Sequence, residues 1–178
     1  MEMYTGGDLV TLIRKNNAVF SQDEIKSYMY DLLKGLKALD EMEIMHRDIK
    51  PENIMIRQVG DIKKMVIGDF GLASKTNLPK YLLERCGTPG YVAPEIANFK
   101  TGERLSSKCD IFSLGVIFHI LLCRAPLFTG SNCDEVYSKN KKMEFDLDAL
   151  KYDSIDSQAM ELLKKMLHED SQERISAA

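Results

Sequence analysis

The sequence predicts a mainly α-helical domain with one small β-hairpin, and three observations lead to this prediction. Two segments, 21–43 and 157–168, repeat apolar residues with the period of one buried helical face, and 110–122 is apolar all round. Two short β-prone runs lie between these helical segments. With 178 residues, 44% of them hydrophobic, the chain can bury a core as one domain or as part of a larger one.

The first long helix carries a complete start signal. Ser21 is placed as the N-cap, Glu24 three residues later completes a capping box, and Phe20 with Ile25 is placed for a hydrophobic staple. The helix should therefore begin at Ser21 and end near residues 41–43. The side chains expected on its buried face are Ile25, Tyr28, Met29, Leu32, Leu33, Leu36 and Leu39.

The β-prone runs are Asn53–Arg57 and Lys64–Gly68, joined by Gln58-Val59-Gly60-Asp61, which predicts a hairpin with a four-residue loop. From Ala73 to Pro94 no periodicity is found, which predicts a long loop. A buried helix is expected over 110–122, and the next over 157–168. The inward side chains of this last helix are expected to be Ala159, Met160, Leu162, Leu163, Met166 and Leu167.

Composition excludes several functional classes. The net charge is −3, from 24 Lys and Arg against 27 Asp and Glu, without a long basic run, so we expect no nucleic acid or membrane surface as a partner. The most apolar run, Ile111–Cys123, is well short of the roughly 20 residues that span a bilayer. The four cysteines form no C-x-x-C pair and follow no signal-like stretch, which predicts reduced thiols in a cytoplasmic or nuclear protein.

Three motifs carry the chemistry. They are His46-Arg47-Asp48-Ile49-Lys50-Pro51-Glu52-Asn53, then Asp69-Phe70-Gly71, then Ala93-Pro94-Glu95. In this order they resemble the catalytic loop, the metal-binding loop and the end of the activation segment of protein kinases. The resemblance covers residues 1–178 and implies an activation segment at 69–95. Lys50 and the segment Cys86–Glu95 further resemble Ser/Thr kinases rather than tyrosine kinases.

Phosphoryl transfer needs positioned groups more than covalent chemistry, so carboxylates and cations must converge on the phosphate. The motifs imply that Asp48 accepts or orients the proton of the acceptor hydroxyl and that Lys50 balances phosphate charge. Asn53 and Asp69 are expected to hold Mg²⁺ for bound ATP through hard oxygen ligands. Thr88 is expected to hydrogen-bond Asp48 and Lys50. Solvated turn residues would be the default interpretation of an isolated Asp-x-Lys-x-x-Asn.

Further roles follow from the resemblance alone. Asp110 resembles the residue that caps the catalytic-loop backbone, and Glu95 with Arg174 resembles a bracing ion pair. Without the family, each supporting residue would be interpreted as plain core. The residues implied to contact the nucleotide are Glu2, Met3, Asp8, Glu52, Asn53, Met55 and Asp69. The residues implied to be structural are His46, Phe70, Gly71, Glu95, Asp110 and Arg174.

Substrate and group are suggested by the same comparison. Asp8 and Glu52 match acids that in basophilic relatives meet ribose or an Arg, which favours protein substrates with Arg or Lys three residues before the Ser or Thr acceptor. The alternative is that both acids are merely exposed. The segments 110–118 and 120–128 look most like the calcium/calmodulin-dependent or calcium-dependent kinases, although Phe112 stands where Trp is usual. Calmodulin or calcium-sensing segments would then lie outside this chain.

Glu84 occupies a special position. It lies four residues before Thr88, where such kinases usually carry a phosphothreonine, so a permanent carboxylate could replace the phosphate and pair with Arg47. The alternative is a solvated loop Glu.

Some expected parts are not found among the 178 residues: the Gly-rich loop, the strand Lys and its helix Glu. The sequence therefore predicts the C-terminal lobe of the α+β kinase fold, from the hinge to the start of the last helix, without its small lobe and inactive or nearly inactive alone. It is then a fragment of an active Ser/Thr kinase. The alternative is a truncated, non-catalytic peptide-binding or regulatory module, but such a module has no need of Asp48, Lys50, Asn53 and Asp69.

Overall fold

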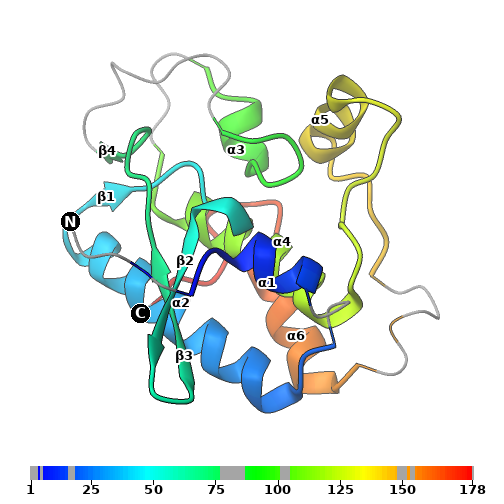
Figure 1. Cartoon of the computed structure of the whole chain (residues 1–178). Helices are drawn as coiled ribbons and strands as arrows, with labels where there is room; N and C mark the ends of the chain where they lie inside the picture. The colour runs from blue at the N-terminus through cyan, green and yellow to red at the C-terminus, as the bar shows by residue number, and fades with distance from the viewer. Residues whose placement is uncertain are drawn as a thin grey trace.

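The computed structural model describes residues 4, 6–15, 19–76, 87–100, 105–147, 152 and 155–177. In this part the protein is mainly helical with two small antiparallel sheets, as predicted (Figure 1). The helices are α1 Leu9–Lys15, α2 Gln22–Glu41, α3 Pro94–Ala97, α4 Lys108–Cys123, α5 Cys133–Lys141 and α6 Ser157–Met166, with a 3₁₀ turn at Pro51–Asn53. The strands are β1 Ile44–Met45, β2 Ile54–Val59, β3 Ile62–Ile67 and β4 Ser74–Lys75.

Helix α2 begins as its sequence predicts. The Glu24 amide donates to Ser21 Oγ at 3.2 Å, and the Ser21 amide donates to Glu24 Oε2 at 2.9 Å, which completes the capping box. Phe20 packs edge-on against Tyr28, with the ring centroids 5.9 Å apart. The Asp31 carboxylate accepts from the Met65 amide at 3.1 Å and so joins α2 to the hairpin.

The hairpin is tighter than predicted. Ile54 pairs with Ile67 and Val59 with Ile62, so the turn contains only Gly60 and Asp61. Gly60 has a φ of 59°, which a two-residue turn needs and which Gly adopts freely, so both strands extend further than expected. On the other edge of β2, the Gly6 amide donates to the Ile56 carbonyl at 3.1 Å, and the chain leads from there into α1.

The segment after Ala73, expected to be a loop, contains β4. This two-residue strand pairs with β1 in the register Ile44 to Lys75 and Met45 to Ser74. Strands this short give no periodic signal in the sequence. The pairing has a consequence for function, because β1 directly precedes His46 and β4 follows Asp69 closely.

Helix α4 is the centre of the core, and twelve of its residues are buried. α2 and α6 pack on it at one end of the molecule, whereas α3 and α5 lie at the other end (Figure 1). Gly115 allows close approach of α6, since a Cβ there would lie 3.0 Å from atoms of Met166 and Leu167. Among the described residues, no helix combines the length and apolarity that crossing a membrane requires.

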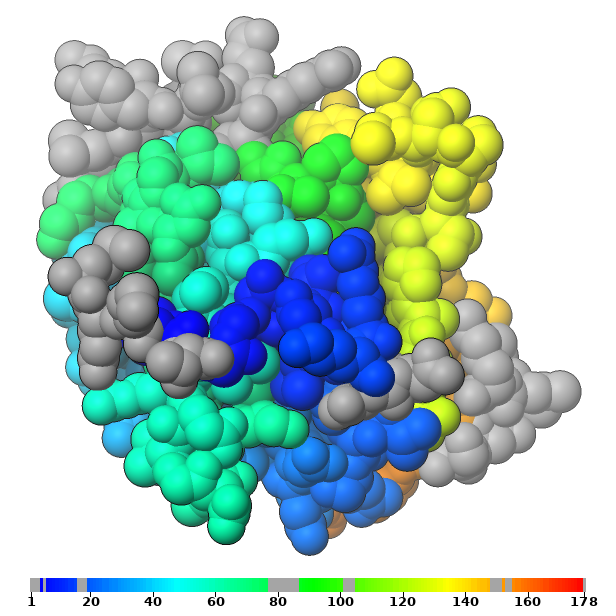
Figure 2. Space-filling view, in the orientation of Figure 1, coloured from blue at the N-terminus to red at the C-terminus, as the bar shows by residue number. Residues whose placement is uncertain are grey.

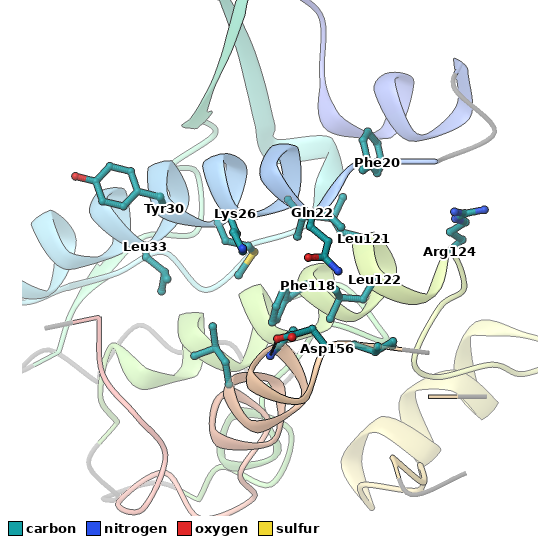
Figure 3. A pocket seen from close by; sticks show the side chains of 15 residues that line it. Phe20, Gln22, Lys26, Tyr30, Leu33, Phe118, Leu121, Leu122, Arg124 and Asp156 are labelled. Carbon is teal, nitrogen blue, oxygen red and sulfur yellow. Dashed lines mark hydrogen bonds between the residues drawn. The ribbon is translucent and has the colours of Figure 1, made fainter. Parts of the chain in front are cut away.

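The predicted inward faces of α2 and α6 do not close completely. Leu33, Ala159 and Leu162 are only half-buried. They line a cavity of about 520 Å³ that also contacts Phe118 and Leu122 of α4 (Figure 3). The two helices each pack on α4 and leave this gap between them, so the helical period placed these residues on the correct side but overstated their burial.

Candidate active site

Asp110 holds the start of the catalytic loop from inside the core. Its Oδ2 accepts from the His46 amide at 2.6 Å and its Oδ1 from the Arg47 amide at 2.8 Å. Burial raises the pKa of Asp110, while the two amide donors act in the opposite direction. Arg47 has a φ of 67°, a conformation that costs energy for a side chain of this size. The two hydrogen bonds therefore stabilise a bend that places Asp48 at the surface.

His46 connects this loop to the segment that carries Asp69. Its Nε2 lies 2.9 Å from the Gly68 carbonyl, and its Nδ1 accepts from the Asp48 amide at 3.3 Å. These partners assign the neutral ring with its proton on Nε2. The ring also packs edge-on against Phe70 at 5.0 Å. Phe70 itself is half exposed, so the stack is closed on one side only.

Three side chains converge on the Asp48 carboxylate. Thr88 Oγ1 donates to Oδ1 at 2.7 Å, Lys50 Nζ lies 2.7 Å from Oδ2, and Asn53 Nδ2 donates to Oδ2 at 3.1 Å. Lys50 Nζ also donates to Thr88 Oγ1 at 2.9 Å. The structure thus brings together four residues that the sequence analysis selected, from positions up to 40 apart.

The environment of Asp48 favours its charged form. Burial raises the pKa of Asp48, but hydrogen bonds from Lys50, Thr88 and Asn53, with the charge of Lys50, outweigh burial and hold it below its ordinary value. The side chain of Asp48 is 12% exposed and that of Lys50 22%. The carboxylate is therefore ionised at neutral pH and still reachable by a partner.

The hairpin brings Asn53 and Asp69 together. The Gly68 amide donates to the Asn53 carbonyl at 2.8 Å, so Asp69 follows directly beside Asn53. Asp69 has a φ of 54°, and its Oδ1 accepts from the Gly71 amide at 3.1 Å. Asn53 donates through Nδ2 to Asp48, and its Oδ1 accepts no hydrogen bond within the described part of the chain.

This donor set fits Mg²⁺, which proteins commonly bind with one or two oxygen-bearing side chains plus the phosphates of a nucleotide. In the described ranges, no three His, Cys, Asp or Glu side chains gather into a site that could hold a metal without such phosphates. Asn53 Oδ1 and the Asp69 carboxylate are the groups that could hold the ion.

The structure describes some of the residues that are expected to contact the nucleotide. Asp8 forms an isolated β-bridge with Met55, and a Cβ at Gly68 would lie 3.2 Å from Met55 Cγ, which sets these residues in a row leading to Asp69. The Asp8 carboxylate accepts from the Thr11 amide at 2.6 Å, and this bond lowers the pKa of Asp8. Sequence reasoning missed this helix-capping contact, although Asp directly before a helix is a common N-cap signal. Glu2 and Met3 lie outside the described residues.

Glu52 is exposed within the catalytic loop. Its charge adds to burial in raising the pKa of Tyr91 to about 12. On the face shown in Figure 2, the cyan residues of the catalytic loop lie between α1 and the green segment that leads into α3.

Arg47 Nε donates to the Leu72 carbonyl at 2.7 Å, while its buried Nη1 has no partner among the residues that the structure describes. Glu84, its expected partner, lies outside them.

The segment after Thr88 is held by two residues that sequence reasoning missed. Ser113 Oγ of α4 donates to the Tyr91 carbonyl at 2.7 Å. Asn140 of α5 accepts from the Gly90 amide at 3.1 Å and donates to the Val92 carbonyl at 2.7 Å. Asn140 lies in a polar run, Ser138–Lys142, where no signal separates a buried Asn from a solvated one.

Arg174 and Glu95 form the ion pair that the resemblance implies. Nη1 lies 2.6 Å from Oε1 and Nη2 lies 2.9 Å from Oε2, so the pair is bidentate. The three remaining N–H groups of Arg174 donate to the carbonyls of Lys108, His168 and Glu169. The guanidinium also lies over the Phe112 ring, 5.2 Å from its centroid. The end of the described chain is thus fixed to α3 and α4.

Comparisons with known proteins agree with the motifs. A family model described as "Protein kinase domain" matches residues 1–178. The chain is 39% identical over 175 residues to calcium-dependent protein kinase 5 of Plasmodium berghei, covering 98% of this chain and 30% of that protein. It is 38% identical over 180 residues to serine/threonine-protein kinase DCLK1 of Rattus norvegicus, covering 99% and 40%. With a probable serine/threonine-protein kinase 2 of Plasmodium falciparum, it shares 41% identity over 142 residues, 80% of this chain and 27% of that protein.

The chain thus spans between about a quarter and two fifths of the length of these relatives. The predicted resemblance to protein kinases, and among them to the calcium-dependent kinases, is confirmed.

Proposed function

The chain belongs to the protein kinase family, and we propose that it is the large lobe of a Ser/Thr kinase that transfers the γ-phosphate of ATP to protein substrates. Residues 1–178 would be the part of the kinase domain from the hinge to the start of its last helix, with 69–95 as the activation segment. The observation that supports this most directly is the cluster around Asp48, where Lys50, Asn53 and Thr88 all contact one carboxylate.

Asp48 would orient the acceptor hydroxyl and accept its proton. Both carboxylate oxygens are held by hydrogen bonds, so the side chain has a fixed direction before any substrate arrives. Lys50 lies 2.7 Å from Asp48 and can turn its ammonium to an incoming phosphate without leaving the cluster. Thr88 joins the catalytic loop to the segment that receives the peptide, because its hydroxyl contacts both Asp48 and Lys50.

Asn53 and Asp69 would hold Mg²⁺ and through it the phosphates of ATP. When bound, this ion neutralises charge on the phosphates and fixes their position. The hydrogen bond from Asn53 Nδ2 to Asp48 leaves the amide oxygen for the metal and ties the metal side of the cluster to the proton-accepting side. Asp8 and Met55 would face the ribose and the adenine.

We further propose a preference for Arg or Lys three residues before the acceptor. Glu52 is exposed within the catalytic loop and supports this proposal. Asp8 supports it less, because the Thr11 amide already occupies one of its oxygens. A peptide series with Arg, Lys or Ala at that position, assayed with the wild type and with Glu52→Gln, measures the preference. Equal turnover of all three peptides by the wild type would contradict it.

Glu84 would keep the activation segment ordered without phosphorylation by pairing with Arg47. The buried Nη1 of Arg47, which has no partner among the described residues, supports this proposal, since an unsatisfied cationic nitrogen in the interior is costly. We expect Glu84→Ala to lower turnover and Glu84→Asp to retain most of it. Unchanged turnover of Glu84→Ala would show that Glu84 is a solvated loop residue.

The 178 residues contain no Gly-rich loop or strand Lys to hold the phosphates from above. We propose that a small lobe completes the site and that these residues alone transfer phosphate negligibly. Losing one electrostatic stabiliser commonly costs about 100- to 1,000-fold in turnover. The alternative function is a non-catalytic module that binds peptides, for which the groups on Asn53 and Asp69 would have no use.

Phosphate transfer by the native protein that contains this chain tests the proposal. The purified protein is incubated with ATP, Mg²⁺ and a peptide that has Arg three residues before a Ser, and in parallel with the matching Tyr peptide. We expect phosphate on the Ser peptide only. Asp69→Asn should remove it by weakening metal binding, while Asp61→Asn, in the exposed hairpin turn, should not.

Three results would each contradict one part of the proposal. Peptide binding without transfer would support the binding module, and transfer that Asp69→Asn leaves unchanged would place the metal elsewhere. Transfer at the wild-type rate by residues 1–178 alone would show that no small lobe is needed.

A further inference from the structure

Helix α5 has one fully buried side chain, and that side chain is polar. Asn140 is 0% exposed, whereas the other residues of the helix are half-buried or exposed. A buried amide is costly unless both its N–H and its C=O groups find partners. The only deeply inserted residue of this helix is therefore maintained by specific hydrogen bonds and not by apolar contact.

Both partners of Asn140 belong to one short backbone segment. Asn140 Oδ1 accepts from the Gly90 amide, and Nδ2 donates to the Val92 carbonyl. Between them, the Tyr91 carbonyl accepts from Ser113 Oγ of α4. Two helices thus fix three consecutive residues, and Asn140 makes two of the three hydrogen bonds.

The fixed segment adjoins the Asp48 cluster. The Tyr91 amide donates to the Thr88 carbonyl at 3.1 Å, and the Thr88 hydroxyl donates to Asp48 at 2.7 Å. Gly90 has a φ of 91°, a conformation that lies outside the usual range of other residues and that the bond to Asn140 helps to maintain. Hydrogen bonds, joined by the backbone of residues 90–92, therefore link α5 through Thr88 to Asp48.

We propose that Asn140 is a positioning residue, which sets the backbone of residues 88–92 for a peptide substrate and thereby determines peptide affinity. This inference rests on the proposed function, because it assumes that the segment receives a peptide. The chemistry is specific to an amide. Leu supplies neither hydrogen bond, and Asp accepts from Gly90 but sets a second oxygen against the Val92 carbonyl.

The test measures binding of a peptide in the native protein, independently of phosphate transfer. The peptide has Arg three residues before the acceptor and Ala in place of the acceptor Ser, and its dissociation constant is measured by fluorescence anisotropy. We expect Asn140→Leu to weaken binding about 10-fold, as the loss of two hydrogen bonds predicts. Asn140→Asp should weaken it less, and the affinity for ATP should not change.

Asn98→Ala is the matched control. Asn98 also donates through Nδ2 to backbone carbonyls, those of Pro94 and Lys141, between α3 and α5, but it does not contact residues 90–92. This variant should bind the peptide as the wild type does. Hydrogen exchange at the Gly90 amide gives an activity-independent readout, and we expect it to accelerate in Asn140→Leu only.

The outcomes separate this inference from the proposed function. Wild-type protein that binds the peptide but transfers no phosphate would contradict the proposed function, while weaker binding by Asn140→Leu would still support the role of Asn140. Faster exchange at Gly90 with unchanged peptide affinity would overturn the inference, and so would a wild type that binds no peptide. If Asn140→Leu does not fold, Asn140→Asp and Ser113→Ala are decisive: unchanged peptide affinity in both would overturn it.

Discussion

Two clusters of charged side chains in this molecule use their hydrogen-bonding capacity to different extents. Arg174 is fully buried, and all five of its N–H groups have partners in Glu95 and three backbone carbonyls. In the cluster around Asp48, Lys50 is partly exposed and Asn53 keeps its amide oxygen free of hydrogen bonds within the described residues. The saturated cluster fixes structure, and the unsaturated one retains groups that can bind a substrate or metal.

Asp110 resembles Arg174 in this respect, although it lies next to the catalytic loop. Both of its oxygens accept from backbone amides and the residue is only 1% exposed, so a ligand cannot reach it. Proximity to the site is therefore a weaker indicator of a chemical role than unused hydrogen-bonding capacity. Replacing residues in each cluster should separate stability from turnover.

The largest effect on stability is expected for Arg174→Leu. The change leaves the Glu95 carboxylate without its cation in a mostly buried position and removes donors from three carbonyls. Breaking such a pair commonly costs about 3–5 kcal/mol in the free energy of unfolding, which denaturant titration measures. Lys165→Leu, which removes an exposed cation, is the control. A loss no larger than that of the control would contradict the bracing role.

Asp110→Asn should have a smaller effect on stability, about 2 kcal/mol, because an amide NH₂ replaces one of two oxygens that face backbone amides. Turnover should fall as well, since the bend at His46 and Arg47 places Asp48. The unfolding free energy and kcat are measured on the same preparation. Full stability with reduced turnover would mean that Asp110 acts on the chemistry directly.

Thr88→Val should shift the pH dependence of turnover. Thr88 is one of the donors that hold the pKa of Asp48 below its ordinary value, so its removal raises that pKa. Because the pKa of Asp48 rises in this variant, the acid limb of kcat/KM should move to higher pH, and an unmoved limb would show that Thr88 does not act on Asp48.

The same depressed pKa affects stability. The contribution of Asp48 to stability is complete above the unfolded pKa and is lost as pH falls through the folded pKa, below about pH 4.

The smallest effect is expected for Glu161→Gln. This residue pairs with Lys165 at 2.5 Å on the surface of α6, where both side chains are more than half exposed. Water and salt screen such pairs strongly. The unfolding midpoint should not change, and a clear decrease would show that exposed pairs matter here as much as buried ones.

Much of the fold could be predicted because its signals are local. The capping box of α2 lies within four residues, and the hairpin follows from two β-prone runs on either side of Gly60. The arrangement of Asp48, Lys50, Asn53 and Thr88 could be anticipated through the resemblance, which carries long-range information that spacing does not.

The rest could not be predicted because it depends on distant contacts. Asn140 lies 50 positions from Gly90, and nothing in its polar neighbourhood indicates burial. Leu33 follows the helical period correctly, but the gap between α2 and α6 that leaves it half-buried is a property of how three helices pack. The capping contact of Asp8 is the exception, because it is local, with Thr11 only three residues away, and an N-cap signal could have indicated it.

The most direct test is to measure turnover and unfolding free energy together for Asp48→Asn in the native protein. We expect kcat for a Ser peptide to fall about 100- to 10,000-fold, the usual contribution of a proton-accepting group. The free energy of unfolding should fall far less than in Arg174→Leu, because the Lys50 side chain that pairs with Asp48 is partly exposed. A large loss of stability with turnover retained would contradict the central claim, because Asp48 would then be a structural residue like Arg174.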